Sequence, residues 1–118
     1  MVESVKMTDL AKERIIVALD VATEKEALDL VGKLREHVGI FKIGLELLNS
    51  VGIGMVQKIT KLGAKVFLDS KFNDIPNTVA GASRAVTRLK VKMFNVHIMG
   101  GLEMMKSAAK AAEEEATK

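Results

Sequence analysis

The chain has 118 residues, of which 48% are hydrophobic and 28% are charged, a composition that is ordinary for one soluble globular domain. Its 18 basic and 15 acidic residues are spread along the whole chain, and no basic run is interleaved with aromatic residues, so nucleic acid is not an expected partner. Cysteine is absent, which excludes a disulfide framework and a thiolate zinc site within this chain.

Residues 1–13 are an N-terminal extension ahead of the first apolar run. This extension carries acidic residues and no apolar segment, so we expect no secretory signal in it, and Met7 is an alternative to Met1 as the start. No apolar run approaches the roughly 18 residues of a membrane span. We therefore expect a cytoplasmic protein with no membrane partner.

The first strand and helix are predicted by a change in the spacing of apolar residues. The run RIIVALD (14–20) predicts a strand, and residues 22–39 follow it with apolar residues three and four apart, which predicts a helix. Thr23 and Glu26 are spaced as in a capping box at the start of this helix, and Gly39 suits its C-terminal cap. The apolar stripe of the helix is formed by Ala27, Leu30, Val31, Leu34 and Val38.

The same alternation continues to the end of the chain. Residues 40–47, 64–71 and 91–98 predict three further strands. Each is followed by a predicted helix: one that Gly63 stops, one that begins near Pro76, and one that ends in the acidic, solvated residues 111–118. The apolar stripes of these helices are Met55, Val56, Ile59 and Leu62; Val79, Ala82, Ser83, Val86 and Leu89; and Leu102, Met105, Ala108, Ala109 and Ala112.

Four consecutive βα units define the expected fold class. Their strand ends, near Asp20, Gly44, Asp69 and His97, recur about every 25 residues, the length of a βα repeat. The alternation predicts an α/β fold with a parallel sheet and right-handed crossovers. An open nucleotide-binding sheet would need a glycine-rich turn after the first strand, and that turn is missing. We therefore predict one partial domain, residues 1–118, that corresponds to units 1 to 4 of a TIM (β/α)₈ barrel.

Charged residues interrupt the apolar strands near their C-terminal ends. In parallel α/β folds these ends form the functional face. Asp69 and Lys71 are two residues apart on a strand, so their side chains share one face of it. Lys42 lies between apolar neighbours, where a buried ammonium needs an anionic partner. For the cluster Asp69, Lys71 and Asp74 we expect a functional role, and a purely structural ion network is the lesser alternative.

Asp20 and His97 have simpler explanations that remain open. An aspartate at the end of a strand is as often a helix cap or turn former as a functional residue. A single histidine is more often a hydrogen-bonded structural residue than a catalyst, and we expect this for His97.

The strand segments together resemble a known family. RIIVALD, FKIGLEL, KVFLDSKFNDIPNT and MFNVHIMGG stand in the order and spacing of the bacterial orotidine 5′-phosphate decarboxylases, from Arg14 to about Ala112. The motif D-x-K-x-x-D-[IV]-x-x-T within them is highly specific. The resemblance implies a TIM-barrel lyase that decarboxylates orotidine monophosphate to uridine monophosphate in pyrimidine biosynthesis, without metal or organic cofactor.

The resemblance also implies roles for particular side chains. Lys71 would donate a proton to C6 of the pyrimidine, with Asp69 beside the departing carboxylate. Lys42 and Asp20 would hold the ribose and support the charged array. The residues implied to contact the substrate are Asp20, Lys42, Asp69, Lys71, Asp74, Ile75, Asn77 and Thr78. Of these, Asp74 and Thr78 match residues that the family lends across a homodimer interface.

This chain departs from the family in three residues or segments and in length. Ser70 stands where a hydrophobic residue is usual, Asn73 where histidine is frequent, and the segment HIMGG (97–101) lacks the usual small polar residues. The four further βα units of the family, which grip the phosphate and read the pyrimidine, are not in these 118 residues. We expect Gly100 and Gly101 to cap a helix rather than bind an anion.

The missing length leaves several interpretations open. The chain is either a decarboxylase fragment, inactive alone, or a half-barrel that completes itself by association. Two other functions remain: a metal-dependent phosphosugar lyase or synthase of the same superfamily, and a non-catalytic half-barrel scaffold.

Overall fold

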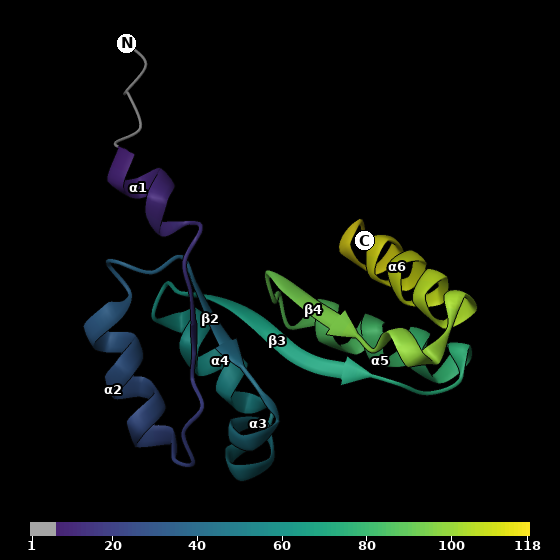
Figure 1. Cartoon of the computed structure of the whole chain (residues 1–118), viewed down its shortest axis with the longest axis horizontal. Coiled ribbons are helices and arrows are strands. Elements are labelled where there is room, and N and C mark those ends of the chain that lie inside the picture. The colour runs from purple at the N-terminus through teal and green to yellow at the C-terminus, as the bar shows by residue number, and fades with distance from the viewer. Residues whose placement is uncertain (1–6) are drawn as a thin grey trace. The chain divides into compact units, whose positions relative to one another are not determined.

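The computed structural model describes residues 7–118. The predicted extension is helical over α1 (Met7–Lys12), and its first six residues lie outside the described part. The chain divides into two compact units, one that ends at Phe67 and one that spans Leu68–Lys118. The division falls inside strand β3 (Lys65–Phe72), drawn in teal in Figure 1. No helix within residues 7–118 has the length and apolar character needed to cross a membrane.

The predicted alternation of strands and helices is confirmed. The strands β1 (Ile16–Ala18), β2 (Ile40–Ile43), β3 and β4 (Met93–Val96) form one sheet in the order β1-β2-β3-β4. β1 and β2 are parallel, and Ile16 lies opposite Ile40. Sequential strands that are neighbours, with helices between them, are the arrangement of a parallel α/β fold, as the sequence predicts.

The first unit packs the helices α2 (Glu24–Leu34), α3 (Leu45–Val51) and α4 (Gly54–Lys61) with its strands. Its core includes Phe41 and Ile43 of β2 and Val56 and Ile59 of α4, all fully buried. The N-terminal cap of α2 is confirmed, because the hydroxyl of Thr23 accepts a hydrogen bond from the Glu26 backbone N–H at 3.2 Å. The predicted stop of α4 is also correct, since Gly63 follows it with φ 83°.

Two predictions in the first unit are wrong. Helix α2 ends at the cap residue Arg35, not at Gly39. A Cβ on Gly39 would lie 2.7 Å from both Glu13 Cα and the Lys12 carbonyl oxygen, so this glycine permits a close backbone approach. The second predicted strand, 40–47, stops at Ile43, because Gly44 ends it and becomes the N-cap of α3. Helix α3 itself was not predicted.

The second unit contains α5 (Pro76–Arg88), the short 3₁₀ helix η1 (Ile98–Gly100) and α6 (Leu102–Ala116). Helices α5 and α6 pack against each other (Figure 1). Pro76 occupies the first turn of α5, as predicted, where its missing N–H costs no hydrogen bond. The core of this unit is a cluster of Val79, Met104 and Ala108, flanked by Phe72, Val96 and Met105.

The predicted apolar stripe of α6 is wrong by about one position. Its buried residues are Met104, Ala108 and Ala111, whereas Leu102 and Ala109 are exposed. An alanine-rich helix offers two adjacent stripes of similar character, and packing decides between them. The Met104 side chain occupies the space beside Gly100, where a Cβ would lie 2.0 Å from the sulfur.

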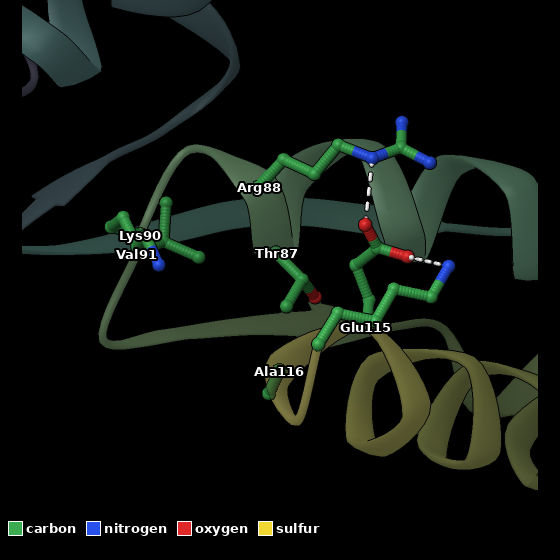
Figure 2. A pocket seen from close by; sticks show the side chains of 7 residues that line it. Thr87, Arg88, Lys90, Val91, Glu115 and Ala116 are labelled. Atoms are coloured by element: carbon green, nitrogen blue, oxygen red, sulfur yellow. Dashed lines mark hydrogen bonds and ion pairs between the residues drawn. The ribbon is translucent and has the colours of Figure 1, made fainter.

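The acidic C-terminal segment is not simply a solvated helix end. Helix α6 continues to Ala116, and the Glu115 side chain is only 9% exposed. Its Oε1 lies 2.8 Å from Arg88 Nε, a contact marked by a dashed line in Figure 2. Its Oε2 lies 3.1 Å from Lys118 Nζ. The ion pair with Lys118 and the hydrogen bond from Arg88 hold the pKa of Glu115 below its ordinary value. Glu115 therefore ties the end of α6 to the end of α5.

Candidate active site

Strand β3 ends in a close lysine–carboxylate pair. Lys71 Nζ lies 2.7 Å from Asp69 Oδ2, and the two side chains share one face of the strand, as their spacing predicts. The Asp69 side chain is 10% exposed and that of Lys71 49% exposed. A buried carboxylate thus anchors an ammonium group whose surface remains open to a ligand.

Asn95, on the neighbouring strand β4, contacts both Asp69 and Lys71. The sequence alone does not predict this role. The Nδ2 of Asn95 donates to Asp69 Oδ1 at 2.7 Å, and its Oδ1 accepts from the Lys71 backbone N–H at 2.8 Å. The only signal for Asn95 was one amide side chain in the otherwise apolar run MFNV. We define Asp69, Lys71 and Asn95 as the lysine cluster.

The Lys71 backbone is in an unusual conformation. Its φ is 50°, in the left-handed region that residues other than glycine rarely adopt. Such a residue costs on the order of 1–3 kcal/mol and persists only where its surroundings enforce it. The hydrogen bond from the Lys71 N–H to Asn95 is one contact that holds it there.

The remaining predicted residues of the second unit follow β3 at the start of α5. Asp74 Oδ1 accepts a hydrogen bond from the Ile75 backbone N–H at 2.7 Å, so this carboxylate shapes the turn before the helix. Asp74, Ile75, Asn77 and Thr78 are all exposed. Asp69 and Lys71 are therefore in contact, while Asp74 lies in the exposed turn that follows.

In the first unit, Asp20 and Lys42 lie close to Gly44. Asp20 is exposed just after β1, and Lys42 is partly buried within β2. A Cβ on Gly44 would lie 3.6 Å from Asp20 Oδ1 and 4.0 Å from Lys42 Cε. These two predicted residues thus both lie beside the start of α3, at distances where a methyl group on Gly44 would make ordinary van der Waals contact.

His97 and the glycine pair have structural roles, as predicted. The Nδ1 of His97 accepts from the Met99 N–H at 3.1 Å, and its backbone N–H donates to the Phe72 carbonyl at 2.8 Å. Gly101, at φ 89°, is the N-cap of α6. Ser70, the departure inside the motif, bonds the Leu68 carbonyl through its hydroxyl at 3.4 Å.

Comparison with known proteins places this geometry in a family. Residues 13–118 match the model of the family described as Orotidine 5'-phosphate decarboxylase / HUMPS family. A relative from Syntrophomonas wolfei, named Orotidine 5'-phosphate decarboxylase, is 55% identical over 108 residues, which are 92% of this chain and 45% of the relative. One of the same name from Heliobacterium modesticaldum is 52% identical over 104 residues, 88% of this chain and 43% of the relative.

A solved structure has a similar fold. The crystal structure of an uncharacterized conserved protein from Geobacillus kaustophilus superposes with a TM-score of 0.80 at 34% identity, over 88% of this chain and 48% of that one.

The fold and the lysine cluster together define a class: half of a parallel βα barrel with charged residues at the carboxyl end of its third strand. The chain belongs to the orotidine 5′-phosphate decarboxylase / HUMPS family. It spans about half the length of the curated relatives it matches and corresponds to their N-terminal part. The family predicted from the strand segments is confirmed.

Proposed function

We propose that this chain supplies the charged half of an active site that converts orotidine 5′-phosphate to uridine 5′-monophosphate and CO₂. One observation carries the proposal: the family motif folds into the Lys71–Asp69 pair, 2.7 Å apart, with Asp69 buried and the ammonium accessible. The names of the relatives support the same reaction. The proposed chemistry uses side chains alone, with neither a metal nor an organic cofactor.

The reaction needs a positive charge beside C6 of the pyrimidine. When the bond from C6 to the carboxyl carbon breaks, CO₂ leaves and the electron pair stays on C6. A preorganised ammonium stabilises this charge as it develops and then donates a proton to C6, which gives the product and a neutral Lys71 that solvent reprotonates. Asp69 balances the lysine charge and fixes the direction of its side chain.

The other predicted residues have binding roles in this proposal. Asp20 and Lys42 bind the ribose, while Ile75, Asn77 and Thr78 line the substrate site. Asp74 and Thr78 act in the site of a second subunit of a homodimer. Asp74 is exposed in the turn before α5 and Thr78 is exposed in the first turn of that helix, which leaves both available to a partner. We also assign the enzyme to the cytoplasm.

A chimera tests the proposal, in which this chain replaces the matched 45% of the Syntrophomonas wolfei relative. The chimera is expected to form uridine 5′-monophosphate in the presence of a metal chelator. Lys71→Ala should lower its kcat by several orders of magnitude, because electrostatic and general-acid contributions are each worth about 100-fold or more.

The matched control is Lys25→Ala, because Lys25 also pairs with an aspartate, Asp29 at 2.9 Å, but on the exposed surface. This variant should keep the parent rate. Activity of Lys71→Ala within about tenfold of the parent would contradict the role of Lys71. If a metal chelator abolishes turnover by the chimera, the result would favour the metal-dependent lyase. If the chimera folds but binds no nucleotide, the result would favour a non-catalytic scaffold.

A further inference from the structure

We propose that Asn95 is a positioning residue that holds the Lys71 ammonium in its reactive place. This inference rests on the proposed function of Lys71. Its basis is a closed ring of contacts within the second unit: Asn95 Nδ2 to Asp69 Oδ1, Asp69 Oδ2 to Lys71 Nζ, and the Lys71 backbone N–H to Asn95 Oδ1. All three contacts lie between 2.7 and 2.8 Å.

The ring accepts the amide of Asn95 in one orientation only. A backbone N–H can only donate, so it requires the amide oxygen, and an ionised carboxylate can only accept, so it requires the amide nitrogen. Of the side chains close to this size, only an amide offers a donor and an acceptor at these two places. Leucine offers neither, and aspartate offers no donor when ionised.

Asn95 therefore connects both ends of Lys71. At the backbone it bonds the N–H of a residue with φ 50°, and at the side chain it orients the carboxylate that pairs with the ammonium. Loss of Asn95 would free the strained backbone to relax and the Asp69 carboxylate to turn. The ammonium would then occupy its reactive position for a smaller fraction of the time, and a displacement of about 1 Å can cost on the order of 100-fold in rate.

The test uses the chimera with Asn95→Leu, which removes both hydrogen bonds, and Asn95→Asp, which keeps the acceptor and loses the donor. We expect both to lower kcat on the order of 10–100-fold while KM stays within about threefold, because Lys71 acts mainly in the transition state. Asn49 provides matched controls, since its Nδ2 bonds a backbone carbonyl, that of Leu45 at 2.7 Å, on an exposed helix. Asn49→Leu and Asn49→Asp should leave kcat unchanged.

The outcomes separate this inference from the proposed function. No product from the parent chimera would overturn the proposed function itself. An active parent with Asn95 variants within about threefold of its kcat, or with changes in KM alone, would overturn the positioning role. Rates are taken per folded molecule, well below each melting temperature, so that a purely structural loss does not imitate the effect. If Asn95→Leu does not fold, the isosteric Asn95→Asp decides.

Discussion

Lys71 is held by one contact at its backbone and one at its ammonium group. Only the contact of the ammonium group could be predicted from the sequence. The pair with Asp69 follows from a spacing of two residues on a strand, which any sequence displays directly. The bond to Asn95 joins residues 24 apart and depends on the register of β3 and β4. The left-handed φ of Lys71 has no sequence signal either, because lysine does not favour that region.

Ser83 provides a prediction at the scale of one residue. Its side chain is fully buried in α5, and its hydroxyl has no hydrogen-bond partner among residues 7–118. A buried polar group without a partner costs about 1–3 kcal/mol. Ser83→Ala should therefore raise the free energy of unfolding by about 1 kcal/mol, as measured by chemical denaturation.

The control for this change is Ser107→Ala on α6, where the side chain is only partly buried. That substitution should change stability by no more than about 0.5 kcal/mol. A loss of stability in Ser83→Ala would show that its hydroxyl has a partner in solution.

At the scale of elements, the strands and most helices were predictable because their apolar spacing is local. Four strands and the helices after them follow the expected order. Helix α3 was missed because the apolar residues of LELL directly continue those of β2. Only Gly44 separates the two, and a single glycine within an apolar run is consistent with either structure.

The close contact between Gly39 and the backbone of Lys12 and Glu13 leads to a prediction about stability. A methyl group there would meet the backbone of Lys12 and Glu13 at 2.7 Å, and backbone cannot move aside as a flexible side chain can. Gly39→Ala should lower the free energy of unfolding by about 1–3 kcal/mol. Gly32→Ala is the control, because a Cβ there has no atom within 4 Å inside α2, and it should stabilise by up to about 1 kcal/mol.

The free energies of unfolding of both variants can be compared by urea denaturation, provided that the dependence on urea concentration has the same slope as in the parent. Equal stability of Gly39→Ala and the parent would mean that the segment around Lys12 shifts without cost.

The link between α5 and α6 predicts a pH dependence. The pKa of Glu115 is lowered from its ordinary value of 4.5, first by Lys118 and then by Arg88, so the folded state binds this proton less tightly than the unfolded state does. Its stabilising contribution is therefore present above pH 4.5 and is lost as the pH falls through the lowered pKa. The melting temperature of Glu115→Gln should depend less on pH below 4.5 than that of the parent.

Glu114→Gln is the matched control, because the Glu114 side chain is 50% exposed on the adjacent position. Identical pH profiles for the parent and Glu115→Gln would exclude a contribution from the Arg88–Glu115–Lys118 contacts.

At the scale of the whole molecule, we expect the isolated 118-residue chain to self-associate. Strands β1 and β4 stand at the two ends of the sheet order, and open strand edges pair readily with other chains. Ile98, Met99 and Leu102 are each at least 60% exposed in the second unit. Sedimentation in dilute buffer should show dimers or larger species, and the chain should form no uridine 5′-monophosphate. A stable monomer that turns over substrate would contradict both expectations.

The proposed dimer makes a second prediction at this scale, because Asp74 would serve the site of the other subunit. In the chimera, Asp74→Ala and Lys71→Ala should each be nearly inactive. Mixing them should restore part of the activity, since a heterodimer would contain one site with both residues intact. The mixture must be made where subunit exchange is demonstrated, for example with differently tagged subunits. Exchange without recovery would assign Asp74 to the site of its own subunit.

The close packing of Met104 beside Gly100 has a consequence for chemical ageing. A sulfoxide oxygen on Met104 would have to enter a space that is already filled, next to a fully buried apolar cluster. Met99, five residues earlier and 76% exposed, can take up the same oxygen in water without displacing anything. Peroxide should therefore oxidise Met99 first, and this oxidation should leave the fold intact. Oxidation of Met104 requires the contact between η1 and α6 to open, and the sulfoxide then prevents that contact from forming again.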